Sequence, residues 1–436
     1  MQFLFRVIIL FLILFNFRVP GLYNSAFVAI ILCTFYYIWH RGSIPFTQFY
    51  QRYNIAILIG TVVLAFVIVI IAYLHKTEVM SAREKRTWIE FMMLWATVFA
   101  LPLLVEGKES TAFKELSLLI CYAFAIQGAI GLAAYLYTPL GDFLIRLKPE
   151  DALVLDEGTE FSNRFRFYNL SGTRLVELTA SFGVAFIVFF WVQLKYECFL
   201  MKGWIKYFIL GFIFLGTVFS GRTGFIGLLM GLGGWLLFSY TKIFTFLRKN
   251  ILYIIGFYLF VQLVFAFGFT AKQRQSFEDE VLPFAFEWYY NHQKYGKYQV
   301  NSMETTRNHY YYLYDETLLE GHGVGAFGGR FYLYPHSDAG YINTLVFGGI
   351  PFLLCLIIYQ CLYFVHPIAI GLKSNSRDER INLVFFLMLF VYVFVVEIKA
   401  STVGYLHVIE AMYLALGAGY IMQQYYSQQY PDELTE

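Results

Sequence analysis

The feature that most constrains this chain is a series of apolar stretches, each about 20 residues long, that recurs along its whole length. A helix of about 20 apolar residues is long enough to cross a hydrocarbon layer of about 30 Å. Hydrophobic residues make up 59% of the 436 residues and charged residues 14%, against roughly 25% charged residues in soluble proteins. The pattern therefore predicts an all-α polytopic membrane protein.

Hydropathy and length predict about 12 transmembrane helices in a single domain that covers residues 1–436. These helices are expected at about 3–16, 21–40, 54–75, 88–105, 116–138, 173–194, 204–219, 223–241, 251–270, 341–366, 381–397 and 403–422. The apolar N-terminus has no small-x-small cleavage site and is followed by Arg18 and Pro20, so we interpret it as a retained first helix.

Lysine and arginine in short loops indicate which face is cytoplasmic. Three such connections fall on one face, which we predict to be cytoplasmic and to hold both termini; they contain Lys195, Lys202, Lys206, Arg248, Lys249, Lys373, Arg377 and Arg380. The basic loop at about 75–86 falls on the other face, as an exception or because an early helix is miscounted. Two long segments, 139–172 and 271–340, then lie outside, and the second is aromatic enough to predict amphipathic helices on the membrane surface.

Composition and spacing exclude several other classes of protein. A net charge of +2 gives no field for nucleic acid, and the five cysteines show no CxxC spacing. No cluster of metal-ligating residues has a recognisable spacing, so we expect neither a metal nor a cofactor. The segment GHGVGAFGG, 321–329, matches a nucleotide-binding loop only weakly, and its glycines are expected to let the backbone turn tightly against a ligand or a helix.

Cationic and titratable residues gather on the predicted outer face, which is unusual under the positive-inside rule. Guanidinium groups bind phosphate bidentately, and pyrophosphate is the phosphate species expected at a membrane surface. The candidate residues are Arg164, Arg166, Arg174, Arg222, Arg307, His322, Arg330, His336, Asp338, Glu397 and Lys399. The alternatives are a lipid-headgroup contact for Arg222, a solvated loop charge for Arg164 or Arg166, an i,i+3 pair with Glu177 for Arg174, and snorkelling for Lys399.

Two of these candidates lie in motifs. Arg222 is the centre of SGRTG, 220–224, a predicted tight hairpin whose glycines leave backbone N–H groups free for an anion at a helix N-terminus. His336 follows a proline and precedes Ser337 and Asp338 at the start of a predicted helix. The helix N-terminus should depress its pKa, so that a neutral imidazole takes a proton from a sugar hydroxyl; the alternative is an interfacial hydrogen bonder.

Three features together resemble the membrane glycan polymerase and ligase superfamily, which contains the O-antigen polymerases (Wzy) and the O-antigen ligases (WaaL). They are SGRTGFIGLLMGLGGWLL at 220–237, GHGVGAFGG followed by HSDAGYINTLVFGGIPFLL within 321–354, and the twelve-helix layout with two long outer loops.

The resemblance implies a GT-C-like glycosyltransferase in the bacterial inner (cytoplasmic) membrane, with its active site facing the periplasm. Donor and acceptor would be undecaprenyl-diphosphate-linked oligosaccharides, within membrane lipids and with a chain-length regulator protein as a further partner. Arg222 and Arg166, followed by Arg330, would hold the donor diphosphate, and His336 would activate the acceptor.

The resemblance implies polymerisation of O-antigen or related surface polysaccharide repeat units, and two alternatives stay open. An O-antigen ligase would transfer the polymer to lipid A-core, although Gly348 comes one residue late for the ligase spacing after the histidine motif. A transporter or flippase of lipid-linked sugars should show broken helices, inverted repeats and charges near the midplane. The sequence indicates neither broken helices nor repeats, and its charges lie at the outer boundary.

Overall fold

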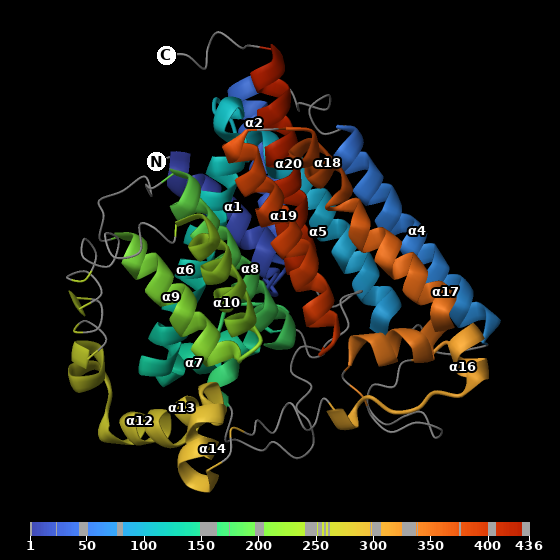
Figure 1. Ribbon diagram of the computed structural model, residues 1–436. Coiled ribbons are helices and arrows are strands. Elements are labelled where there is room, and N and C mark those ends of the chain that lie inside the picture. The colour runs from blue at the N-terminus through green and yellow to red at the C-terminus, as the bar shows by residue number, and fades with distance from the viewer. Residues whose placement is uncertain are drawn as a thin grey trace.

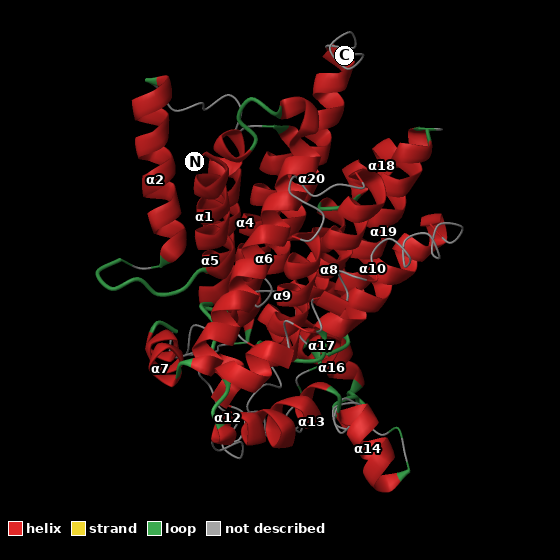
Figure 2. Cartoon of the chain, turned by 90° about the vertical axis from the view of Figure 1, so that its left-hand side faces the viewer, coloured by secondary structure: helices red, strands yellow, loops and turns green. Residues whose placement is uncertain are grey.

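The computed structural model is a bundle of helices (Figure 1, Figure 2), and its described residues form no strand, only an isolated bridge between Val19 and Leu22. The structure describes residues 2–22, 24–42, 51–75, 82–148, 164–173, 175–196, 205–239, 251, 255–256, 259, 262–296, 298, 307–324, 337, 339–374, 376–399 and 407–429. Residues 82–86, 164, 167 and 265 are described by backbone alone. The predicted all-α fold is confirmed.

The long helices run between two ends of the bundle, and α1 begins and α20 ends at the upper end of Figure 1. They are α1 (Gln2–Phe15), α2 (Ser25–Arg41), α4 (Arg52–Leu74), α5 (Ala82–Leu104), α6 (Ala112–Leu136), α8 (Leu175–Tyr196), α9 (Ile205–Ser220), α10 (Gly224–Ser239), α17 (Gly340–Leu362), α19 (Arg377–Glu397) and α20 (His407–Gln429). Among the described residues, six helical spans in α4, α5, α6 with the preceding turn, α8, α17 and α19 are long and apolar enough to cross a membrane. The number of twelve spans stays a prediction.

Short helices lie at the lower end of the bundle in Figure 1, which we call the loop end. They are α7 (Thr138–Arg146), the 3-10 helix η3 (Arg164–Phe167), α12 (Ala271–Ser276), the π-helix η6 (Phe277–Val281), α13 (Leu282–Ala285), α14 (Glu287–Tyr295) and α16 (Asp315–Glu320). A π-helical turn, η5 (Val264–Gly268), precedes α12, whereas η1 (Glu109–Thr111) and α18 (Val365–Lys373) belong to the upper end. Both long segments therefore contain helices, and α12 and α13 lie across the end of the bundle (Figure 2).

Two helices extend beyond their predicted membrane spans. Helix α5 begins at Ala82, although its apolar span, Thr87–Leu104, matches the span predicted at about 88–105. Arg83, Lys85 and Arg86 therefore continue the helix instead of forming a basic loop. Helix α20 likewise continues to Gln429 through polar residues. Hydropathy locates the apolar layer, but a helix continues into water as long as its backbone hydrogen bonds are made.

Helix α17 is broken, which corrects the expectation of unbroken helices. Gly348 and Gly349 have non-helical backbone angles, with φ of 65° at Gly349, and Pro351 follows them. The segment after α16 packs into the break: the N–H groups of His322 and Gly323 donate to the carbonyl oxygens of Val346 and Phe347, both over 2.8 Å. A break inside a membrane helix is tolerated where neighbouring groups satisfy its backbone in this way.

Tyr135, near the end of α6, holds α12 against the bundle. Its hydroxyl donates to the carbonyl oxygen of Gln273 over 3.0 Å, and the Gln273 amide donates back to the carbonyl oxygens of Tyr135 and Leu136 over 3.0 and 2.9 Å. Phe219, Phe269 and Phe277 pack around the same ring with centroids 5.3–5.9 Å away. A capping box between Thr270 and Gln273 starts α12 at this point. The anchor places α13 and α14 over the hairpin between α9 and α10.

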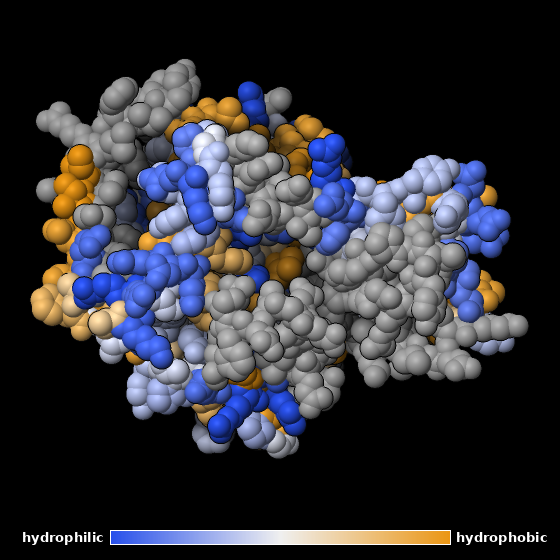
Figure 3. All heavy atoms as spheres, turned by 90° about the horizontal axis from the view of Figure 1, so that it is seen from below, coloured by the Kyte–Doolittle hydropathy of each residue, from blue (hydrophilic) through white to orange (hydrophobic). Residues whose placement is uncertain are grey.

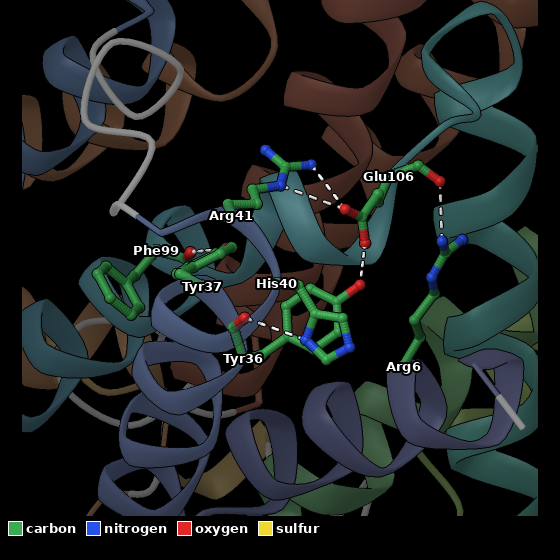
Figure 4. A network of polar contacts seen from close by, with 7 residues as sticks. All are labelled: Arg6, Tyr36, Tyr37, His40, Arg41, Phe99 and Glu106. Carbon is green, nitrogen blue, oxygen red and sulfur yellow. Dashed lines mark hydrogen bonds and ion pairs between the residues drawn. The ribbon is translucent and has the colours of Figure 1, made fainter.

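A second polar network closes the opposite end of the bundle (Figure 4). Glu106, in the turn after α5, accepts from the Arg41 guanidinium over 2.9 and 3.2 Å and from the Tyr36 hydroxyl. Its backbone carbonyl accepts from Arg6 Nη2 over 2.8 Å. Burial raises the pKa of the Glu106 carboxyl, but the Tyr36 hydrogen bond and the Arg41 charge outweigh it and leave the pKa lowered. The network joins α1 and α2 to the rest of the chain.

We expect Gly128→Ala to lower the thermal midpoint of the protein in detergent. Helices α6 and α9 cross so closely that a methyl group at Gly128 would overlap the carbonyl oxygen of Phe212. Overpacking of this kind costs about 1–3 kcal/mol. Gly233→Ala in α10 is the matched control, because open space surrounds that position and alanine favours a helix. Equal midpoints for the two variants would contradict the close crossing.

We expect Glu106→Gln to reduce stability by about 1.5–3 kcal/mol at neutral pH, the value of hydrogen bonds to a charged group. The carboxylate contributes this stability above the ordinary carboxyl pKa of about 4.3, and the contribution is lost as the pH falls through the lowered folded-state pKa. The difference between wild type and variant should therefore shrink below about pH 4. Unfolding midpoints across pH measure it, with Glu109→Gln as the control, three residues later at the start of η1.

Candidate functional site

Arg166 and Arg222 meet at the loop end, although they belong to different segments of the chain. Arg166 lies on η3, and its Nε donates to the carbonyl oxygen of Ser220 over 3.3 Å. Arg222 lies in the hairpin between α9 and α10. Both guanidinium carbons lie over the ring of Phe284 on α13, at 4.5 Å for Arg166 and 5.0 Å for Arg222. The predicted pair of arginines therefore shares one aromatic surface, and we call Arg166, Arg222 and Phe284 the arginine cluster.

The hairpin that carries Arg222 is as tight as SGRTG predicts, since α9 ends at Ser220 and α10 begins at Gly224. Gly221 has a φ of 151°, and a side chain there would lie 3.0 Å from the Thr179 hydroxyl oxygen on α8. The expectation that the N–H groups flanking Arg222 stay free was wrong at Gly221, which donates to the carbonyl oxygen of Thr217 over 2.8 Å. In the first turn of α10, Phe225 and Ile226 donate to Arg222 and Thr223 over 3.0 and 3.2 Å. Anion binding here would depend chiefly on the guanidinium groups.

Arg222 also forms an ion pair with Glu287, the first residue of α14. Both side chains are largely buried, with 21% of the Arg222 side chain and 13% of the Glu287 side chain exposed. Burial lowers the pKa of Arg222, because a low-dielectric site disfavours the charged form. An anion beside this arginine therefore offsets part of the cost of burying its charge. Neither Phe284 nor Glu287 has a sequence signal, since each is one of many such residues in an irregular segment.

Lys148 is connected to the arginine cluster through Asn169. Its Nζ donates to Asn169 Oδ1 over 2.6 Å and to the carbonyl oxygen of Ser171 over 2.9 Å. Asn169 in turn donates through Nδ2 to the carbonyl oxygen of Arg166 over 2.7 Å. Burial lowers the pKa of Lys148 to about 7. Sequence reasoning missed this residue, because a lysine just after a short amphipathic helix is an ordinary pattern.

The mouth of α17 lies at the same end of the bundle, as the sequence predicts. Ser337 is buried, its hydroxyl donates to the carbonyl oxygen of His309 over 3.1 Å, and it accepts from the N–H of Ala339 over 3.2 Å. Asn343, one turn into the helix, donates to the carbonyl oxygen of Ser337 over 2.6 Å. Four predicted residues cannot be placed here: Arg174, Arg330, His336 and Asp338 lie outside the described residues, as does the side chain of Arg164.

Glu397 lies beside the mouth of α17. It is 1% exposed at the end of α19, where its carboxylate accepts from the Thr344 hydroxyl over 3.5 Å. The adjoining turn accepts a hydrogen bond from the Tyr310 hydroxyl at the carbonyl oxygen of Ile398 over 2.8 Å. Burial, followed by the neighbouring Tyr341 and Glu397 groups, raises the pKa of Tyr310 to about 12. Glu397 therefore contacts the helix that His336 precedes.

Lys399 and Arg307 lie close to this region along the chain but are less buried. The backbone N–H of half-buried Lys399 donates to the carbonyl oxygen of Val396 over 2.9 Å. Arg307 is exposed, and its carbonyl oxygen accepts from the N–H of Tyr310 over 3.2 Å. These contacts involve the backbone, so they assign no chemistry to either cation.

His322 packs against the break in α17. Its Nε2 lies 2.7 Å from the Thr317 hydroxyl. Burial lowers the pKa of His322, and the nearby His75 charge acts in the same direction. The flanking Gly321 has a φ of 72°, and a side chain there would overlap the backbone of Gly348. The glycines of this segment thus let it approach a helix, one of the two roles predicted for them.

Buried carboxyl groups form a second set of residues that sequence reasoning largely missed. Glu90 on α5 accepts from the Tyr359 hydroxyl over 2.7 Å. Glu177 on α8 lies 3.0 Å from Nδ1 of His407 on α20, whereas Arg174, its predicted i,i+3 partner, lies outside the described residues. Glu410 is 4% exposed on α20. The signal was available, because ionisable residues inside apolar helices are usually functional or paired.

The loop end thus presents two groups of candidate residues. The arginine cluster lies under α13 and α14, whereas His322, Glu397 and the mouth of α17 lie by α16 and α17. Figure 3 shows hydrophilic residues gathered over this end, with apolar residues between them. No protein-family model, curated protein or solved structure matches the chain. The functional argument therefore depends on the site and on the sequence motifs described above.

We expect the stability of the protein to rise between pH 7 and pH 9 because of Lys148. The folded state releases this proton at about pH 7, whereas the unfolded chain keeps it up to about pH 10.4. Between these values the unfolded state binds more protons, so a higher pH favours folding. Thermal midpoints of wild type and Lys148→Met across pH measure the effect. The rise should be smaller in Lys148→Met. It should be unchanged in the control Lys272→Met, because Lys272 is an exposed lysine on α12. Parallel profiles for all three proteins would refute the role of Lys148.

Proposed function

We propose that the chain is a membrane glycosyltransferase that polymerises undecaprenyl-diphosphate-linked repeat units of O-antigen or a related surface polysaccharide. The observation that carries the proposal is the meeting of Arg166 and Arg222 over one ring at the loop end. Two guanidinium groups match the two phosphates of a lipid-linked diphosphate, and the adjoining apolar helices suit its lipid tail. The resemblance of both sequence motifs to the polymerases and ligases supplies the reaction.

In the proposed reaction, the hydroxyl oxygen of the acceptor sugar attacks the anomeric carbon of the donor sugar. The bond from this carbon to the diphosphate oxygen breaks, and undecaprenyl diphosphate leaves with the electron pair. Arg166 and Arg222 would offset the charge that builds on the departing diphosphate. By resemblance, His336 would take the proton of the attacking hydroxyl. The buried start of α17 supports a role for this segment in orienting that hydroxyl. No nucleotide is needed, since the energy lies in the sugar–diphosphate bond.

A transporter or flippase of lipid-linked sugars is the second candidate, and the break in α17 favours it. Discontinuous helices and buried ionisable groups are typical of transporter binding sites. Gly348 and Gly349 interrupt α17, and Glu90 and Glu410 are buried inside the bundle. The glycosyltransferase remains the better proposal because the arginines lie at the end of the bundle, whereas transporter sites lie near the midplane.

We expect purified wild-type protein to convert undecaprenyl-diphosphate-linked repeat units into a ladder of polymers on a gel. Arg222→Ala, Arg166→Ala and His336→Ala should each lower the rate by about 100-fold or more, the usual cost of removing a group that stabilises the transition state. Arg274→Ala is the matched control, because this arginine lies on α12 at the same end and donates to the carbonyl oxygen of Ala266.

Each other result has a distinct meaning. A ladder that survives the arginine substitutions would leave the polymerase standing and refute the arginine cluster as its site. A product that forms only when lipid A-core is added would identify a ligase. No product under either condition, together with movement of labelled lipid-linked sugar across proteoliposomes, would identify a transporter.

A further inference from the structure

Gln127 is a buried polar residue on α6, and the proposed reaction does not use it. It is 1% exposed, and neither Oε1 nor Nε2 of its side chain has a hydrogen-bond partner among the described residues. A buried amide without partners is costly, because it has given up its hydrogen bonds to water. Buried polar groups in native proteins are therefore nearly always paired, with protein atoms or with an ordered water.

A small cavity lies beside this side chain, between α6, α8 and α9. Gln127 lines it from α6, Ser220 from the end of α9, and Asn169 from the segment after η3. Much of the remaining wall is apolar and includes the rings of Phe182 and Phe219. The cavity leaves about 10 Å³ for the centre of a water molecule, which is room for one.

Two of the lining residues have oxygen atoms that can bind a water. The Ser220 hydroxyl donates to the carbonyl oxygen of Gly216 over 2.7 Å, so its oxygen can accept from another donor. Asn169 Oδ1 accepts from Lys148 over 2.6 Å and has a second lone pair. With the Gln127 amide, the cavity offers three polar partners, the usual number for a buried water.

We propose that this cavity binds one water molecule, which joins the Gln127 amide to Ser220 and Asn169. Gln127 Nε2 donates to the water, and the water donates its two protons to Ser220 Oγ and Asn169 Oδ1. The remaining Gln127 Oε1 is an acceptor, the kind of buried group that is more often left without a partner. The inference goes beyond the proposed function and does not depend on it, because the water does not contact the substrate.

The water connects α6 to the two residues that contact Arg166. The carbonyl oxygen of Ser220 accepts from Arg166 Nε over 3.3 Å, and Asn169 Nδ2 donates to the carbonyl oxygen of Arg166 over 2.7 Å. Ser220 also lies two residues before Arg222 in the hairpin. Gln127 is therefore a positioning residue, which holds both segments of the arginine cluster against α6 through one water.

A structure of the full-length protein in detergent, at a resolution that shows ordered waters, tests the site directly. We expect one density peak within hydrogen-bond distance of the Gln127 amide, Ser220 Oγ and Asn169 Oδ1. The peak should be lost in Gln127→Met, which keeps nearly the same shape without the polar atoms. The proposal is overturned if wild type shows no peak, or if the peak persists unchanged in Gln127→Met.

Thermal midpoints test the same site without the need to see the water. If the cavity is dry, Gln127→Met removes an unpaired buried amide and should raise the midpoint. If the water is bound, the variant deprives it of a partner, and we expect the midpoint to fall by about 2 °C or more. Ile126→Met is the matched control, because Ile126 is the adjacent residue of α6 and is 36% exposed. An equal or higher midpoint in Gln127→Met would contradict the proposal.

A double-mutant cycle separates a shared water from two independent effects. If one water joins Gln127 to Ser220, Gln127→Met and Ser220→Ala together should lower the midpoint by less than the sum of their separate effects. Ser117→Ala is the control partner for Gln127→Met, because the Ser117 hydroxyl likewise donates to a carbonyl oxygen one turn earlier, that of Phe113 at 2.7 Å. These two substitutions should be additive, since ten residues of helix separate them by about 15 Å. Additivity of the Gln127 and Ser220 variants would refute the shared water. None of these measurements uses a diphosphate, so their outcome is independent of the proposed function.

Discussion

Polar groups in an interior that excludes water need hydrogen-bond partners within the protein itself. The arrangement of the loop end depends on this constraint. The break in α17 frees carbonyl oxygens inside the bundle, and His322 and Gly323 supply the donors that they need. Gly321 and Gly349, both with positive φ, allow the two backbones to approach. The direction in which α17 begins, and so the position of its mouth, follows from this contact rather than from the helix itself.

The same constraint acts on side chains and connects distant helices. Tyr359 donates to Glu90 while its hydroxyl also contacts Tyr363 and Thr61, over 2.7 and 3.0 Å, so α4, α5 and α17 share one polar group. Helices α8 and α20 are joined through Glu177 and His407. Satisfying these groups leaves little freedom in how the helices rotate, because each buried carboxyl group that loses its partner carries a cost of several kcal/mol, on the order of 3–5.

Apolar stretches located the long helices, and SGRTG located the hairpin, because both depend on residues that are adjacent in the sequence. The meeting of Arg166 with Arg222 was predicted only through a resemblance, since no local pattern brings η3 to the hairpin. Phe284, Glu287 and Lys148 were missed because their roles come from tertiary contacts made by the Tyr135 anchor and by Asn169. Gly348, Gly349 and Pro351 indicate the break in α17 in the sequence, but a rule based only on the length of an apolar stretch does not predict a break.

The network around Glu106 has a consequence for the order in which the protein is assembled. Arg6 is buried in the first helix, and the described partner of its guanidinium is a carbonyl oxygen 100 residues later in the chain. This contact can form only once the turn after α5 has been synthesised. The docking of α1 against that turn therefore follows the synthesis of α2, α4 and α5, and the position of α1 is fixed by a part of the chain made after it.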